Sequence, residues 1–189
     1  MNGSTTRPLL VMRGIGVSYG GIPALSDVDF DLYPGEIHAL VGAHRAGKSS
    51  LVKLLSGAVR KERGEILFDG KRIEAFTPQS SMRSGIGIVY QHLNIIPSLN
   101  AAENVFAGRL PHTAAIALDT RAMHERAARL FQSLGFPIDV DVPVHRLSAA
   151  AQHIVELGRV LYSEPRILIL DEISSKLTPE EMERVYPLL

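Results

Sequence analysis

Apolar and polar residues alternate near the start of the chain. Over residues 26–32, the apolar positions Val28, Phe30 and Leu32 fall on one face, which is the pattern of a half-buried antiparallel strand. Proline followed by glycine at residues 34–35 predicts a turn directly afterwards. A small antiparallel subdomain is therefore expected at the N-terminal end.

Beyond this turn, apolar residues come in short continuous runs, which are typical of strands buried on both faces. The runs alternate with helical and glycine-containing segments, so an α/β fold with a mixed sheet is expected. Strands are predicted at residues 36–41, 64–68, 86–90 and 166–171, the last at the centre of a parallel sheet, and a helix is predicted at residues 48–55.

Between residues 100 and 162, apolar residues recur at helical spacing. One helix is predicted to start after Asp119 as N-cap and to stop at Gly135, and a second is predicted at 152–162. The apolar face of the first consists of Met123, Ala127, Leu130, Phe131 and Leu134. Approximately residues 98–162 are expected to form a helical insert within one domain spanning 1–189, and residues 111–118 are expected to be a surface loop.

Composition and charge exclude several classes of function and of binding site. The 189 residues are 46% hydrophobic, enough for a core, and 20 basic residues balance 20 acidic ones, so no nucleic-acid partner is expected. There is no cysteine, which excludes disulfides and thiolate metal sites, and the seven histidines have no metal-site spacing. The absence of cysteine also fits a reducing compartment, so a cytoplasmic location is expected. Neither a signal peptide nor an apolar run of about 18 residues is present, so any membrane role is expected to be through partners.

A phosphate-loop pattern, GxxxxGK[ST], stands between a predicted strand and a predicted helix. Its glycines let backbone N–H groups point toward an anion at the positive end of the helix. Lys48 is predicted to bridge the β- and γ-phosphates of a nucleotide, Ser49 to bind Mg²⁺ and Ser50 to add a phosphate contact. An incidental glycine turn is the alternative. The predicted nucleotide-binding residues are Gly42, Ala43, His44, Arg45, Ala46, Gly47, Lys48, Ser49 and Ser50.

Two adjacent acidic residues follow the apolar run that ends at Leu170. In phosphate-loop NTPases, an acidic residue at this position orients the metal ion and its water, so Asp171 is predicted on the Mg²⁺ side and Glu172 as the base that activates the attacking water. A solvated strand end is the alternative. The accompanying phosphate loop favours the functional interpretation.

These segments together resemble the ATPase domains of ABC transporters, over essentially the whole chain. The resemblance is carried by Tyr19, GAHRAGKSS, Gln91, LSAAAQHIVELGRVL, ILILDE and SSKLT. The greatest similarity is to the N-terminal ATPase half of ribose-, xylose- and galactose-type sugar importers, and it is carried by the segments VDFDLYPGEIHALVG and GIVYQHLNIIPSLNAAENVFAGR. The resemblance implies a P-loop NTPase core.

The resemblance also implies roles for residues outside the two motifs. Tyr19 would stack on adenine, and its alternative is a strand-end tyrosine in the core. Gln91 would reach Mg²⁺ and the attacking water, and its alternative is an ordinary loop glutamine. Residues 93–99 would face a membrane subunit. Ser148 lies in the counterpart of the LSGGQ signature, which contacts ATP held by an opposing domain, and it is also predicted to cap the helix that follows.

By this resemblance the chain is an ATP-binding, ATP-hydrolysing subunit that powers carbohydrate import, with ATP and Mg²⁺ as cofactors. The implied partners are a second ATPase domain in the same or another chain, transmembrane permease subunits and, indirectly, a periplasmic or extracellular sugar-binding protein. The implied location is the inner face of the cell membrane. A degenerate or truncated nucleotide-binding module with little hydrolysis is the alternative.

Departures from the family pattern favour that alternative. Arg45 replaces an inner glycine of the phosphate loop, which costs about 1–2 kcal/mol if the backbone there is left-handed, unless the guanidinium contacts phosphate. Residues 149–151 are alanines where the signature has Gly, Gly and Gln. Ile173 replaces a proline and Lys176 a small residue, and the chain is expected to be incomplete because it ends before the family's switch histidine.

Overall fold

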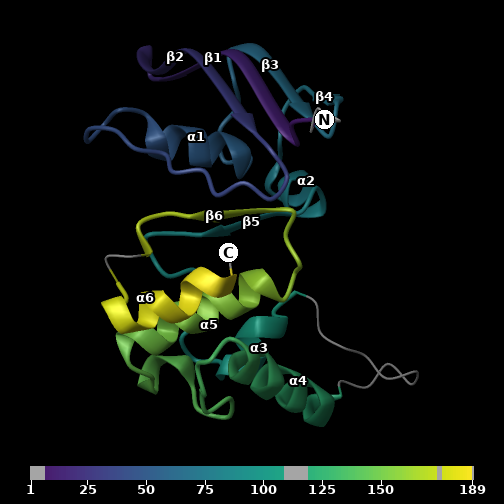
Figure 1. Ribbon diagram of the computed structural model, residues 1–189, viewed down its shortest axis with the longest axis vertical. Coiled ribbons are helices and arrows are strands. Elements are labelled where there is room, and N and C mark those ends of the chain that lie inside the picture. The colour runs from purple at the N-terminus through teal and green to yellow at the C-terminus, as the bar shows by residue number, and fades with distance from the viewer. Residues whose placement is uncertain (1–6, 109–118, 174–175, 189) are drawn as a thin grey trace, which may run out of the picture. The chain divides into compact units, whose positions relative to one another are not determined.

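The computed structural model describes residues 7–108, 119–173 and 176–188. The chain divides into two compact units, Met1–Ile86 and Gly87–Leu189 (Figure 1). The loop expected at residues 111–118 lies outside the described residues. In the described part of the chain, none of the helices has the length and hydrophobicity that a bilayer crossing requires.

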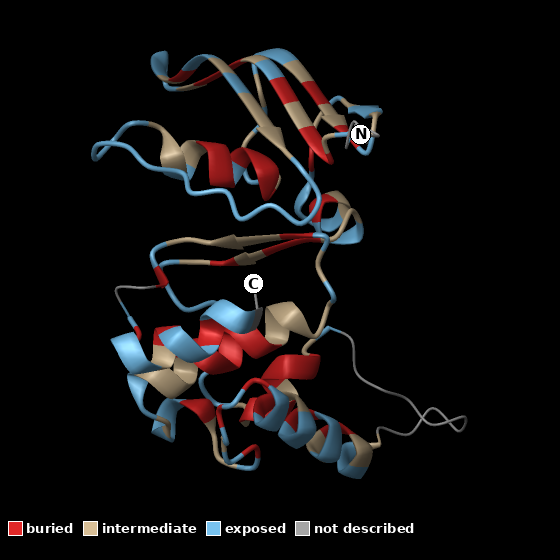
Figure 2. Cartoon of the chain, viewed as in Figure 1, coloured by how far each residue is buried: buried red, intermediate tan, exposed pale blue. Residues whose placement is uncertain are grey.

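The first unit contains an antiparallel sheet in which the strand order is β2-β1-β3-β4. Its strands are β1 (Leu10–Tyr19), β2 (Ile22–Leu32), β3 (Arg63–Phe68) and β4 (Lys71–Ile73). β1 carries much of the core, because Leu10, Met12 and Ile15 are fully buried (Figure 2). The predicted strands at 26–32 and 64–68 are confirmed, and Val28, Phe30 and Leu32 are half-buried as expected.

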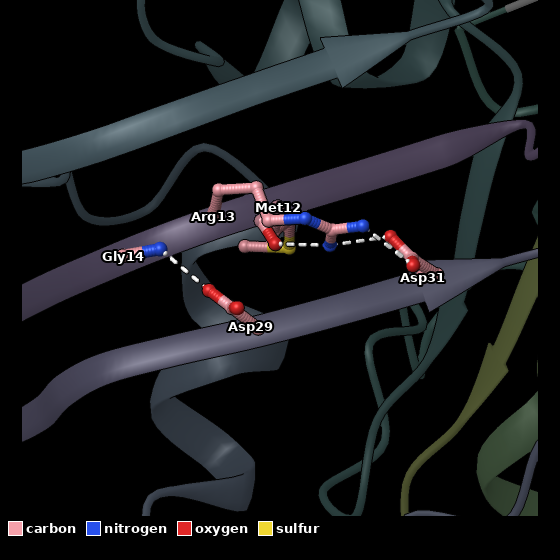
Figure 3. A network of polar contacts seen from close by, with 5 residues as sticks. All are labelled: Met12, Arg13, Gly14, Asp29 and Asp31. Atoms are coloured by element: carbon pink, nitrogen blue, oxygen red, sulfur yellow. Dashed lines mark hydrogen bonds and ion pairs between the residues drawn. The ribbon is translucent and has the colours of Figure 1, made fainter.

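A bulge and an ion pair mark the register of β1 and β2. The register shifts between Met12 and Ile15, where Gly14 has a φ of 62° and donates its N–H to Asp29 Oδ1 at 2.8 Å. Beside it, the Arg13 guanidinium donates to both carboxylate oxygens of Asp31, at 2.5 and 2.6 Å (Figure 3). This hydrogen-bonded guanidinium lowers the pKa of the Asp31 carboxyl.

Two helices belong to the first unit. α1 (Lys48–Leu55) has the predicted bounds and buries Leu51, Leu54 and Leu55. α2 (Pro78–Arg83) begins with a capping box from Thr77.

The prediction of a strand at residues 36–41 is wrong. The segment follows the confirmed turn at 34–35 but lies outside every strand, and its apolar side chains are exposed, Ile37 by 76% and Val41 by 88%. A strand exists only through hydrogen bonds to a neighbouring strand, and the described sheet of this unit is formed by four other segments. An apolar run indicates hydrophobicity but cannot specify such a neighbour.

The second unit combines a two-stranded sheet with helices. The sheet consists of β5 (Ile86–Val89) and β6 (Ile167–Leu170), which confirms the strands predicted at 86–90 and 166–171. The helical elements are α3 (Ala101–Phe106), α4 (Thr120–Ser133), η1 (Val144–Arg146), α5 (Ala149–Leu161), α6 (Pro179–Val185) and η3 (Tyr186–Leu188). Fully buried residues from α3, α4 and α5, including Phe106, Phe131 and Ile154, form its core.

The prediction that the strand at 166–171 lies at the centre of a sheet is wrong for the sheet that the structure describes. β6 has one neighbouring strand, β5, and three of its four residues are only partly buried. Its continuous apolar sequence predicted burial on both faces, but the number of neighbouring strands depends on tertiary pairing, which that pattern does not contain.

Helix ends in the second unit follow the predicted signals. Asp119 Oδ1 accepts the Ala122 N–H at 2.9 Å, and Gly135, with a φ of 76°, follows the end of α4. Ser148 caps α5, which begins at Ala149 rather than at the predicted residue 152. Among the described residues of the stretch expected to form the insert, three α-helices are present: α3, α4 and α5.

Candidate active site

The phosphate loop turns tightly before it enters α1. The Ala46 N–H donates to the Ala43 carbonyl at 3.1 Å, and Gly47 occupies the N-cap position with a φ of 95°. The N-cap residue, Gly47, makes no side-chain hydrogen bond to the first turn of α1. The helix therefore presents first-turn N–H groups without a side-chain cap, as an anion-binding helix start requires.

Glycine is required at position 47 by contact as well as by conformation. A Cβ atom there would lie 2.7 Å from Leu25 Cδ2 and 2.8 Å from the carbonyl oxygen of Ala24. β2 therefore packs closely against the end of the loop, and a side chain at this position would displace it.

Lys48 folds its side chain over the phosphate loop. Its ammonium group donates to the carbonyl oxygens of Gly42 at 2.7 Å and Ala43 at 3.0 Å. These carbonyls hold a positive charge directly above the loop, where a phosphate oxygen could replace them as the acceptor. Ser50 is half-buried, whereas the other polar loop positions, His44, Arg45 and Ser49, are exposed.

Arg45 adopts the left-handed backbone conformation, with a φ of 65°. The condition under which this arginine strains the loop is therefore met, and the cost is about 1–2 kcal/mol. Its exposed side chain extends from a loop whose backbone geometry suits glycine.

Tyr19 lies at the end of β1 and is 41% exposed, which differs from the core position given as the alternative. The ammonium of Lys53, a residue of α1, lies 5.9 Å from the centre of its ring. The ring is thus held near the helix that the phosphate loop enters, and part of its surface is open for stacking.

Gln91 and Glu172 lie together in the second unit. The Gln91 amide nitrogen donates to Glu172 Oε2 at 2.5 Å, and both side chains are exposed. Gln91 follows β5 and Glu172 follows β6, and the Asp171 N–H donates to the Val89 carbonyl at 2.9 Å. Strand pairing therefore brings the predicted base, Glu172, into contact with Gln91, which is predicted to reach Mg²⁺ and the attacking water.

The backbone of Glu172 is left-handed, with a φ of 55°. A non-glycine residue in this region carries a conformational cost, and such residues concentrate at functional sites. The strained turn directs the Glu172 carboxylate to Gln91 immediately after β6.

Ser148 acts as the helix cap that the sequence predicts. Its hydroxyl accepts the Ala151 N–H at 3.2 Å at the start of α5, and the residue is exposed. The side-chain amide of Gln152 donates to the Leu147 carbonyl at 3.0 Å. The signature counterpart is therefore an ordered helix start with alanines in its first turn.

Sequence reasoning missed two charged residues of α5. Glu156 is 2% exposed, and its Oε1 accepts the N–H groups of Tyr90 at 3.5 Å and Asn94 at 3.3 Å. Arg159 donates to the Asn94 carbonyl at 2.5 Å. Burial raises the pKa of Glu156. The available signal was a glutamate among the apolar positions of a helix, where an unpaired charge is costly.

The predicted Mg²⁺ ligands offer oxygen atoms, which suit this ion. Ser49 belongs to the first unit, whereas Gln91 and Asp171 belong to the second. Among the described residues, no group of three or more His, Cys, Asp or Glu side chains could hold a metal ion alone.

Comparison with known proteins gives a consistent result. Residues 25–175 match the family model described as ABC transporter. A ribose import ATP-binding protein, RbsA 1, of Streptomyces coelicolor is 40% identical over 95% of this chain and 35% of its own length. A putative ribose/galactose/methyl galactoside import ATP-binding protein of Burkholderia cenocepacia is 38% identical over 100% of this chain and 37% of its own length.

Solved structures share the fold. A nucleotide-free ATP-binding cassette from an ABC transporter has a TM-score of 0.82 at 20% identity, over 96% of this chain and 76% of its own. The fold is thus that of a P-loop ATP-binding cassette. The chain spans about a third of the length of the curated relatives it matches, since it covers 35% and 37% of them.

Proposed function

Because the chain belongs to the ABC transporter family, we propose that it binds MgATP and hydrolyses it to power carbohydrate import. The curated relatives, named as ribose or galactose import ATP-binding proteins, support the choice of carbohydrate. The proposal includes a second ATPase domain, transmembrane permease subunits and, indirectly, a sugar-binding protein as partners. It places the chain at the inner face of the cell membrane.

The observation that carries this proposal is the phosphate loop at the start of α1, with Lys48 above it. Lys48 already binds two carbonyl oxygens through its ammonium group. It would exchange them for oxygens of the β- and γ-phosphates, while first-turn N–H groups of α1 donate to the same anion. Ser49 would offer its hydroxyl to Mg²⁺, which supplies charge that neutralises the phosphates, and Tyr19 would stack on adenine.

The hydrogen bond between Gln91 and Glu172 supports the catalytic part of the proposal. The amide nitrogen of Gln91 is bound to the carboxylate, so the remaining polar atom of that side chain is its oxygen. This amide oxygen could accept a hydrogen bond from water or bind Mg²⁺, and Asp171 would bind the same ion. Glu172 would accept the proton of the attacking water while the water oxygen bonds to the γ-phosphorus and the bond from that phosphorus to the bridging oxygen of the departing ADP breaks.

Nucleotide binding with little turnover is the second candidate function. It is favoured by the strained backbone of Arg45 and by Ala149 and Ala150, whose methyl groups stand where the family's two glycines let backbone approach a γ-phosphate. Ala151 stands where the family has a glutamine. Phosphoryl transfer depends on charge aimed at the transferring group, so binding can persist where transfer is slow.

Isothermal titration with MgATP tests the proposal. Lys48→Ala should weaken affinity by about tenfold or more, because it removes the charged phosphate donor, and Tyr19→Ala should weaken it less. Lys71→Ala, at an exposed position of β4, is the matched control and should bind as the wild type does. Equal, tight binding by the wild type and Lys48→Ala would remove the phosphate-loop assignment.

A further inference from the structure

α5 binds the backbone on both sides of Gln91. The carboxylate of Glu156, a residue of α5, accepts the N–H groups of Tyr90 and Asn94 at 3.5 and 3.3 Å. Tyr90 immediately precedes Gln91, and Asn94 follows it three positions later. One buried carboxylate therefore binds the backbone both before and after Gln91.

Arg159 strengthens this contact from the same helix. Its guanidinium donates to the Asn94 carbonyl oxygen at 2.5 Å. Residues three positions apart on a helix lie on the same side, so Glu156 and Arg159 reach the loop together. Both backbone groups of Asn94, its N–H and its carbonyl, are thereby bound to α5.

The burial of Glu156 is costly for a residue that only fills space. Its side chain is 2% exposed, and no hydrogen-bond partner for its Oε2 lies among the described residues. Replacing buried charges with apolar residues of similar volume is often neutral or stabilising. The cost is understandable if the carboxylate fixes a loop that a leucine or methionine could not hold.

We propose that Glu156 and Arg159 are positioning residues, which hold backbone 90–94 so that the Gln91 side chain reaches Glu172. The loop has few other constraints, since residues 91–94 are exposed and belong to no helix or strand. For catalysis this inference rests on the proposed ATP hydrolysis. For the placement of the loop it does not.

Amide hydrogen exchange, measured by NMR on the full chain without nucleotide, tests the placement. Glu156→Leu, which keeps the volume and removes the acceptor, should speed exchange at the Tyr90 and Asn94 amides by about tenfold. Glu156→Gln retains an acceptor oxygen and should restore slow exchange. Amides within α5 should change much less in both variants. Unchanged exchange at Tyr90 and Asn94 in a folded Glu156→Leu protein overturns the proposal.

Arg159→Met decides the question if Glu156→Leu does not fold. It keeps the aliphatic stem and removes the donor to Asn94, and Arg159 is only half-buried. Faster exchange at Asn94 supports the proposal, and wild-type exchange overturns it. Arg126→Met, at an exposed position of α4, is the matched control and should leave both amides unchanged.

ATPase kinetics test the catalytic consequence. Glu156→Leu should lower kcat by about the same factor as Gln91→Ala, measured in the same assay, and should leave KM for ATP within about twofold of wild type. In a Gln91→Ala background, Glu156→Leu should cause no further loss, because its effect passes through Gln91. If the kcat losses of the two single variants multiply in the double variant, the positioning role is overturned. An inactive wild type would count against the proposed hydrolysis, and the exchange experiment would still decide whether α5 holds the loop.

Discussion

The Gln91 side chain donates a hydrogen bond of 2.5 Å to the Glu172 carboxylate, although the two residues are 81 positions apart in the sequence. They meet because β5 and β6 are neighbours in one sheet and each residue follows the end of its strand. Residues that act as one unit give non-additive kinetic losses when they are substituted. The pair should therefore respond to mutation as a unit.

Glu172→Gln should lower ATP hydrolysis by about a hundredfold, because it keeps the shape of the side chain and removes the base. Affinity for MgATP should remain within about twofold of wild type. Phosphate release measures the first quantity and isothermal titration the second. Glu183→Gln, an exposed glutamate of α6, is the control. Wild-type turnover in Glu172→Gln would contradict the base assignment.

Turnover by the isolated chain should be slow and should rise when a complete partner domain is added. Such a domain supplies a signature to the transition state, where positioned charge contributes most to the rate. Titrating the partner into a phosphate-release assay measures this. A rate of several per second without a partner, insensitive to Glu172→Gln, would contradict both expectations.

Arg45→Gly should raise the free energy of unfolding by about 1 kcal/mol, because glycine adopts a positive φ without the clash that a Cβ causes. Urea unfolding measures this. Arg60→Gly, in a described loop position without a positive φ, should instead lower stability slightly. If Arg45→Gly also retains MgATP affinity, the arginine is a steric intruder. A clear loss of affinity would show that its guanidinium binds phosphate.

Gly47→Ala should destabilise the protein by about 2–3 kcal/mol, through its backbone conformation and the close contacts of the added Cβ together. Gly20→Ala separates the two causes, because Gly20 also has a positive φ but no atom lies within 4 Å of a Cβ added there. Urea unfolding of both variants should show the larger loss for Gly47→Ala. Equal losses would mean that packing against β2 contributes nothing.

His153 should make the protein less stable as the pH falls. Burial, and then the charge of Lys176, lower the pKa of His153 below its ordinary value of 6.5. Below that value the unfolded chain takes up a proton that the folded chain does not, so the free energy of unfolding falls as the pH drops through this range. Urea unfolding at about pH 7.5 and about pH 5.5 should show a smaller decrease for His153→Gln than for wild type.

The control for this pH effect is Gln132→Ala, at an exposed position of α4 that carries no ionisable group, which should keep the wild-type pH dependence. The raised pKa of Glu156 acts in the opposite sense, since it favours the folded state at pH values low enough to protonate that carboxyl. Glu156 is present in all three proteins, so the comparison isolates His153. Identical pH dependence in wild type and His153→Gln would contradict the assignment.

The sequence by itself determined what depends on neighbours along the chain. The bounds of α1, the Asp119 and Ser148 caps and the glycine that follows α4 were all predictable, because these signals act within a turn of the residue that carries them. The phosphate-loop motif could be identified from the sequence for the same reason, because its residues are close together along the chain. Its glycines, lysine and serine act through backbone geometry over consecutive residues.

The tertiary structure decided what depends on residues distant in sequence. The segments 36–41 and 166–171 both contain short apolar runs, and both were predicted to be strands. The first lies outside every described strand, whereas the second contains β6. The outcomes differ because a strand forms only beside a partner strand, and an apolar run does not specify that partner. The same pairing of β5 with β6 brings Gln91 to Glu172, and the packing of α5 brings Glu156 to the backbone beside Gln91. Burial and hydrogen bonding between distant segments arise only when the chain folds, so no local pattern encoded these contacts.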